Sequence, residues 1–175
     1  MGAWSELDTE VEVIFNDKNI ESAISTLDDD ELFEDVTDYL KKLRTAFDTG
    51  SKQAVEDISK RNRSFQQQII SEVCDNPTGM LSSSINIERK SEYSYLIGTI
   101  INHIYPMSLE KGRKGFGAIR AKALAFYASN GALIFRKRVG PAKPRPFVAP
   151  AYRKTKSIAR GIVVRKIGEN LKKVK

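Results

Sequence analysis

The chain has 175 residues, enough for one domain with its own hydrophobic core. One cysteine and one histidine exclude an internal disulfide, a cysteine-rich zinc site and a His–His metal site. No apolar run approaches the ~18 residues of a membrane helix, and no signal peptide opens the chain, so we expect a reducing, aqueous compartment and no membrane partner.

The net charge of +7 is unevenly distributed along the chain. Residues 1–75 hold 8 Lys and Arg against 18 Asp and Glu, whereas residues 76–175 hold 21 against 4. This polarity favours head-to-tail contact between copies, in which the acidic part of one meets the basic part of the next. It equally favours a basic surface that binds nucleic acid. Two solvated faces of one monomer are a third interpretation.

The N-terminal half is predicted to be mainly helical. Residues 10–16 alternate and indicate a short strand, and Asn19 is suited to cap a brief helix. Apolar residues at three-to-four spacing then predict a helix, and a weaker pattern of the same kind covers residues 52–73. Gly50 either breaks this helix or is a weak point in one long helix. The apolar stripe before it comprises Leu32, Val36, Tyr39, Leu40, Leu43 and Phe47.

Two antiparallel hairpins are predicted in the second half. Residues 81–90 alternate, with Ile85 and Ile87 inward, and lead into a more apolar strand over residues 93–101. Asn130-Gly131, between two β-favouring runs, is typical of a two-residue type I′ turn. That turn sets the pairing of the second hairpin and places Phe126 opposite Phe135. The predicted core face of this hairpin comprises Leu124, Phe126, Leu133 and Phe135.

Three less regular segments complete the chain. Residues 103–112 predict a turn or one helical turn, and residues 111–120, with three glycines and four cationic side chains, are interpreted as a flexible basic loop. Prolines at 141, 144, 146 and 150 predict an extended surface segment. Its only large apolar side chains, Phe147 and Val148, are expected to anchor it to the hairpin or to a neighbouring subunit. Pro150 then suits the first residue of a basic C-terminal helix.

Catalysis has little support in the sequence. The lone histidine, His103, has no second imidazole to share acid–base work. Asp75 with Glu88 and Lys90 is the pattern closest to an active site, since an acid followed by Glu-x-Lys on a strand can hold Mg²⁺. Exposed strands often carry Glu-x-Lys by chance. We therefore expect neither an enzyme nor a bound metal or cofactor.

The order of motifs resembles a known family. Residues 77–85 (PTGMLSSSI) are similar to its P-x-TG-x-L-x-x-SI signature, and residues 105–112 stand in place of its YA-x-x-x-E-x-G stretch. Residues 145–151 (RPFVAPA) match its x-PF-x-x-PA ending. The family is that of the small tail-component, or tail-completion, proteins of long-tailed double-stranded-DNA bacteriophages. The resemblance covers about residues 52–160.

The resemblance implies a non-catalytic virion protein of the neck or tail end, assembled in the host bacterial cytoplasm as a ring around the DNA channel. The expected fold is α+β: a small antiparallel sheet or partly open barrel packed by a long N-terminal helix, with an extended proline-rich segment and a basic C-terminal helix. Expected partners are further copies of the chain (a hexamer favoured over a dodecamer), connector or neck proteins, tail-tube or terminator proteins, and double-stranded DNA bound without sequence preference. The competing interpretation is a non-enzymatic nucleic-acid-binding module that acts as a monomer or dimer.

Two groups of candidate site residues follow. Contacts with the DNA backbone are expected from Arg113, Lys114, Arg120, Arg136, Lys137 and Arg138. Contacts with a neighbouring subunit or partner are expected from Tyr105, Glu110, Pro146, Phe147, Val148, Pro150 and Tyr152. We expect an acidic N-terminal segment at 1–50, a family core at 51–160 and a basic tail at 161–175. Truncation before Lys143 is expected to leave a folded monomer that forms no ring.

Overall fold

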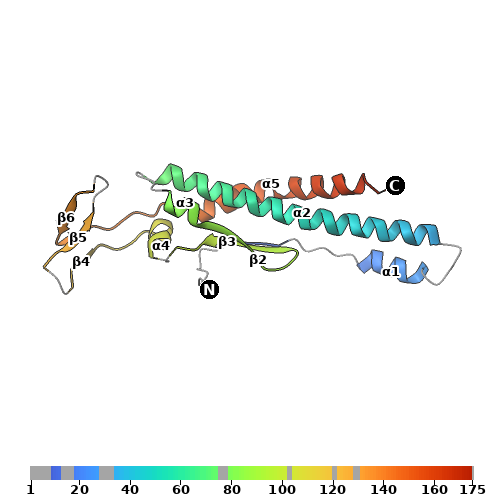
Figure 1. Cartoon of the computed structure of the whole chain (residues 1–175), viewed down its shortest axis with the longest axis horizontal. Helices are drawn as coiled ribbons and strands as arrows, with labels where there is room; N and C mark the ends of the chain where they lie inside the picture. The colour runs from blue at the N-terminus through green and yellow to red at the C-terminus, as the bar shows by residue number, and fades with distance from the viewer. Residues whose placement is uncertain are drawn as a thin grey trace.

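Two long helices, a three-stranded sheet and a projecting β-ribbon (residues 112–146) make up the structure (Figure 1). The fold is α+β, as predicted, and every strand pair described is antiparallel. The computed structural model describes residues 9–12, 18–27, 34–74, 79–101, 104–119, 122–127 and 131–174. The ribbon lies at one end of an elongated molecule, and α1 (Lys18–Leu27) lies at the other (Figure 1). We call the described residues outside the ribbon the body.

The long axis of the body is formed by α2 (Glu34–Val73) and α5 (Val148–Leu171), which run antiparallel and pack along each other. Gly50 lies within the contact. A Cβ added to it would lie 2.8 Å from the Cα atom of Ile167, closer than real side chains permit. Gly50 therefore does not break the helix but allows α5 to approach α2. Residues 50 and 160, after which we expected the segments of the chain to divide, both fall inside these continuous helices.

Polar side chains occupy part of the interface between α2 and α5. Asn62 Nδ2 donates to Thr155 Oγ1 at 3.1 Å, and Asn62 Oδ1 accepts from Gln66 Nε2 at 2.7 Å. All three residues are buried. Further along, Asn170 Nδ2 donates to Gln53 Oε1 at 3.0 Å. Sliding one helix past the other would break the hydrogen bonds from Asn62 to Thr155 and from Asn170 to Gln53, so these two bonds fix the register of the pair.

The sheet has the strand order β1 (Thr9–Glu12), β3 (Ser94–Thr99), β2 (Ile85–Arg89). The predicted hairpin of β2 and β3 is confirmed, with Ile87 opposite Ile97. Of the predicted N-terminal strand, residues 13–16 lie outside the described residues. Since β1 pairs with β3, residues 9–12 of the N-terminal region belong to the same sheet as β2 and β3.

The start of the first predicted strand is wrong, because residues 80–84 form a short helix, α3 (Met80–Ser84). Leu81 and Ser84 are both buried, a three-residue spacing that a helix satisfies and a strand does not. This turn of helix places the Leu81 side chain in the main core, which lies between the sheet, α2 and the start of α5. The buried core residues are Ile69, Ile70, Leu81, Ile85, Ile97, Phe147 and Ala151.

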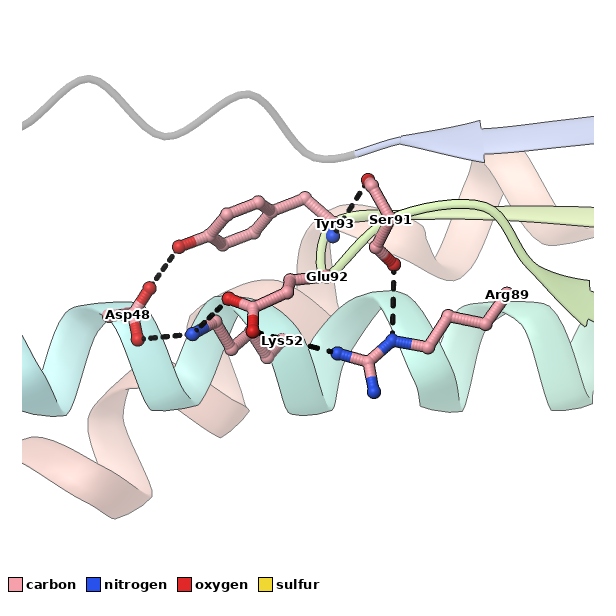
Figure 2. A network of polar contacts seen from close by, with 6 residues as sticks. All are labelled: Asp48, Lys52, Arg89, Ser91, Glu92 and Tyr93. Atoms are coloured by element: carbon pink, nitrogen blue, oxygen red, sulfur yellow. Dashed lines mark hydrogen bonds and ion pairs between the residues drawn. The ribbon is translucent and has the colours of Figure 1, made fainter.

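A polar network clamps the turn between β2 and β3 to the middle of α2 (Figure 2). Tyr93 donates its hydroxyl hydrogen to Asp48 Oδ1, and Lys52 Nζ lies 2.8 Å from Asp48 Oδ2 and 2.5 Å from Glu92 Oε2. Burial alone would raise the pKa of Asp48, but the hydrogen bonds from Lys52 and Tyr93 outweigh it and hold that pKa below its usual value. The hydrogen bond to Asp48, and then burial, raise the pKa of Tyr93.

Shorter elements complete the structure. The brief helix predicted near Asn19 is α1, which lies against α2 and forms an ion pair from Glu21 to Arg44. In place of the predicted single turn, α4 (Ile104–Lys111) is a helix of 8 residues, and it leads into the ribbon. The ribbon strands are β4 (Phe116–Gly117), β5 (Leu124–Tyr127), β6 (Leu133–Arg136) and β7 (Arg138–Val139).

Candidate functional site: the ribbon and the acidic end

The ribbon leaves the body as two paired strands. Arg113 and Ala142 exchange backbone hydrogen bonds in both directions, each 3.0 Å long, and further out β4 pairs with β7 and β5 with β6. At its base Gly112 has a φ of 74°, and a Cβ there would lie 2.7 Å from the carbonyl oxygen of Ala142. Only glycine permits this approach. The segment predicted as a flexible basic loop is therefore largely one side of a hydrogen-bonded ribbon.

The hairpin of β5 and β6 differs from the prediction by one residue of register. Phe126 lies opposite Ile134, and Phe135 lies opposite Ala125, so the predicted Phe126–Phe135 pair is wrong. Register is strongly fixed only where one face of a hairpin is buried. Here Leu133 and Phe135, predicted to be core, are 49% and 65% exposed, so burial does not impose the predicted pairing.

The observed register gathers large apolar side chains on one exposed face. Tyr127 pairs with Leu133, and Ala125 pairs with Phe135, so all four share one side of the hairpin. Tyr127 is 76% exposed. We call Tyr127, Leu133 and Phe135 the apolar ribbon face. An exposed cluster of this kind marks a contact site more often than a solvated surface.

Most of the predicted DNA-contacting cations lie on the ribbon. Lys114, Arg136, Lys137 and Arg138 are exposed, whereas Arg113 is half-buried at the base, with its guanidinium 4.9 Å from the centre of the Phe116 ring. Arg120 lies outside the described residues. Residues 112–146 contain nine Lys and Arg and no Asp or Glu. The ribbon is therefore a strongly cationic projection.

Two predicted interface residues have a role inside the chain instead. The Glu110 carboxylate accepts backbone hydrogen bonds from Phe147 (2.6 Å), Val148 (3.1 Å) and Ala149 (3.4 Å), so it caps the N-terminus of α5. Phe147 is 1% exposed within its own chain. The prediction that Phe147 anchors a neighbouring subunit is wrong, because its ring already fills the main core. Truncation before Lys143 would remove this ring and α5, so the predicted folded truncation is not supported.

The other predicted interface residues divide between core and surface. Val148 packs against the main core, and Pro150 is half-buried in the first turn of α5. Tyr105 and Tyr152 are 56% and 48% exposed, and Pro146 is also exposed. Partial burial, and then the neighbouring thiol of Cys74, raise the pKa of the Tyr105 hydroxyl.

The opposite end of the molecule is acidic and also exposes apolar side chains. At the start of α2, Val36 and Tyr39 are 46% and 47% exposed, although the sequence pattern placed both in the apolar stripe. Glu34, Asp35 and Asp38 beside them are exposed. We call these five residues the acidic end. The sequence around them is strongly acidic, since residues 28–38 contain seven Asp and Glu and no Lys or Arg.

The described part of the chain shows no site for metal-dependent catalysis. No group of three or more His, Cys, Asp or Glu side chains there is placed to hold a metal ion. Lys90 Nζ lies 2.7 Å from Glu88 Oε1, so the two residues of the Glu-x-Lys pattern form an ion pair with each other. Asp75 and His103 lie outside the described residues. Among the described helices, none combines the length and hydrophobicity needed to cross a lipid bilayer.

Comparison with known proteins gives no family. No protein-family model, no curated protein and no solved structure matches this chain.

Sequence reasoning missed the exposure of Val36 and Tyr39 and the face formed by Tyr127, Leu133 and Phe135. Apolar periodicity identifies the inward side of an element only when another layer covers it. The available signal was charge, because both apolar clusters are flanked by charges of a single sign: acidic beside Val36 and basic directly after Phe135.

Proposed function

We propose that this chain is a non-catalytic structural protein of the neck or tail end of a long-tailed phage. Several copies would form a ring around the DNA channel, complete the tail and help to join it to the head. The ring would contact connector or neck proteins on one side and tail-tube or terminator proteins on the other.

The observation that carries the proposal is the meeting of all three resemblance motifs in one core. Leu81 and Ile85 come from the first motif, and Phe147 and Ala151 come from the last, and all four are buried in the main core. Glu110, from the middle motif, caps the helix that begins in the last one. Segments that carry the resemblance but lie far apart in the chain thus contact one another, as a shared fold would require. The arrangement supports a shared fold behind the resemblance.

The exposed surface supports assembly. The ribbon contributes exposed apolar side chains that solvent alone does not favour. Such a surface favours a subunit that is buried against other chains.

The cations of the ribbon support proximity to DNA. Contacts from Lys114, Arg136, Lys137 and Arg138 to phosphates would carry no sequence information and would weaken as salt rises. Such contacts hold any passing sequence yet allow the DNA to slide. This matches the requirement of a channel through which a whole genome moves.

The decisive test deletes the gene from a phage or prophage that encodes this chain. Negative-stain microscopy is expected to show filled heads and tails that fail to join or finish, and the wild-type gene supplied in trans should restore joined particles. Infectious particles of normal appearance from the deletion strain would rule the proposal out.

A ribbon-deleted variant makes the test specific. Removing residues 116–139 joins Gly115 to Gly140, and these two glycines can serve as the two-residue turn of a shortened hairpin. The variant should keep the far-ultraviolet circular dichroism of a helical body but should not restore joined particles. Full rescue by this variant would remove the ribbon from the proposed function.

A nucleic-acid-binding module that acts as a monomer or dimer is the second candidate. The concentration of nine cations without a single acid on the ribbon favours it. Size-exclusion chromatography with light scattering separates the two candidates, since a ring gives a larger multiple of 19.7 kDa, whereas the module gives one or two copies.

A further inference from the structure

We propose that the ribbon of one copy docks on the acidic end of the next copy. The apolar ribbon face would cover Val36 and Tyr39, and the exposed cationic segment 136–138, which directly follows Phe135 along the chain, would lie beside Glu34, Asp35 and Asp38. This inference rests on the proposed function and deepens it, because it names the contact that repeats around the ring.

The two surfaces match in chemistry. Each combines large apolar side chains that are about half exposed or more with a margin of one charge sign. In α2, Val36 and Tyr39 are three positions apart and therefore adjacent on the helix surface. Tyr127 and Leu133 are directly opposite each other on the hairpin. Apolar contact would supply the driving force, and the opposite charges would select the orientation.

The two surfaces lie too far apart to contact each other within one chain. The acidic end is at the start of α2, whereas the ribbon lies beyond the end of α2 (Figure 1). A helix of 40 residues is about 60 Å long, and electrostatic attraction between exposed charges is screened within about 8 Å at physiological salt. Complementary surfaces at opposite poles are therefore available only to different copies.

The placement also favours one mode of assembly. Because each copy carries one ribbon and one acidic end, the contact joins two different patches and leaves both copies with a free patch. Such head-to-tail contacts repeat until a ring closes. A symmetric contact between two ribbons would instead bring two strongly cationic surfaces together, which electrostatic repulsion opposes.

Charge reversal provides the main test. The ribbon variant carries Arg136→Glu, Lys137→Glu and Arg138→Glu, and the end variant carries Glu34→Lys, Asp35→Lys and Asp38→Lys. Sedimentation velocity of each variant alone is expected to show self-association weakened by about 100-fold. An equal mixture should assemble again, since reversed ribbons then meet reversed ends and the two normal surfaces meet each other. A mixture that stays dissociated while the wild type assembles would overturn the docking.

A matched control separates position from total charge. Arg153→Glu, Lys156→Glu and Arg160→Glu change the net charge by the same amount as the ribbon variant, on exposed positions of α5. This control should assemble like the wild type. Equal loss of assembly in the control would show that net charge, and not the ribbon, determines association.

Cross-linking gives an independent readout. In a Cys74→Ser background, Leu133→Cys is placed in one protein and Tyr39→Cys in another, and the two are mixed with a short bismaleimide. We expect a covalent pair that contains one copy of each. A pair of Leu133→Cys copies as the main product, or no covalent pair at any concentration, would overturn the docking. A chain that carries both cysteines should give a ladder that ends at the copy number of the ring.

The docking and the proposed function fail in different experiments. If the wild type forms rings but the mixture and the cross-link fail, the docking is wrong and the phage role stands. If the mixture assembles and cross-links while the deletion strain still makes joined particles, the docking stands and the phage role is wrong.

Discussion

The body and the ribbon differ in the exposure of their phenylalanine side chains. Phe147 in the body is 1% exposed, and Phe135 on the ribbon, only twelve positions earlier, is 65% exposed. Phe147 lies at the capped start of α5, and its ring packs in the main core formed with α2, α3 and the sheet. Phe135 lies on a two-stranded hairpin, which is at best marginally stable alone in water. The difference indicates that the body buries its own core, whereas the apolar face of the ribbon needs contact with another molecule to be buried.

The largest expected effect on the free energy of unfolding concerns these two phenylalanines. Phe147→Ala should lower the free energy of unfolding by about 3–5 kcal/mol, because a fully buried ring leaves a cavity in the main core. Phe135→Ala should change it by no more than about 0.5 kcal/mol. Denaturant unfolding followed by circular dichroism measures both. Equal losses from the two variants would show that the ribbon is part of the same cooperative core.

A second prediction concerns the close contact of α2 and α5. Gly50→Ala places a Cβ against the backbone of Ile167, so the helices must separate, and we expect a loss of about 1–3 kcal/mol. Gly161→Ala is the matched control, because beyond the neighbouring backbone of α5 itself nothing lies within 4 Å of the new Cβ. It should stabilise the protein by about 0.5–1 kcal/mol, since alanine favours a helix over glycine. Stabilisation by both variants would contradict the close contact at Gly50.

Local signals in the sequence predicted the body well. The helical periodicity of α2, the alternation of β2 and β3 and the proline in the first turn of α5 each depend on neighbouring residues. What the sequence could not predict depends on distant partners. The cap that Glu110 provides acts on residues 37 to 39 positions away, and nothing near Gly50 indicates that Ile167 will lie against it.

The ribbon was predicted less well for a physical reason. A one-residue error in hairpin register reverses which side chains share a face, and only burial of one face makes that error costly. The rule that apolar side chains lie inward therefore gave the wrong core face for Leu133 and Phe135. The same rule failed at Val36 and Tyr39. The positions at which the burial rule failed are those at which we propose that copies meet.

The cap on α5 offers a third, smaller test of the body. Glu110→Gln removes the negative charge that accepts three backbone hydrogen bonds at the helix start, and we expect a loss of about 1–2 kcal/mol. Glu169→Gln, on an exposed position near the other end of α5, should change the free energy of unfolding by no more than about 0.5 kcal/mol. Thermal unfolding resolves the difference, because 1 kcal/mol corresponds to about 2–4 °C in a chain of this size. Equal midpoints for the two variants would refute the cap.

The smallest effect is expected at the clamp of Figure 2, and it has a distinctive dependence on pH. Tyr93→Phe removes the hydrogen bond to Asp48, and since Tyr93 is partly exposed we expect a loss of about 1 kcal/mol at neutral pH. The folded pKa of Asp48 is lowered, so the stabilisation is present above the usual value of 3.8 and is lost as pH falls through the folded pKa. The folded pKa of Tyr93 is raised, so the stabilisation is present below the usual value of 10.0 and is lost as pH rises through the folded pKa.

The difference in free energy of unfolding between wild type and Tyr93→Phe should therefore be largest between these two values and shrink on both sides. Tyr152→Phe, at an exposed position of α5, should show no difference at any pH. No difference at any pH for Tyr93→Phe would mean that Tyr93 acts through its ring, which the variant keeps, and not through its hydroxyl group. In that case the hydrogen bond from Tyr93 to Asp48 would contribute nothing of its own, and the turn between β2 and β3 would be held to α2 by packing and by the ion pairs of Lys52.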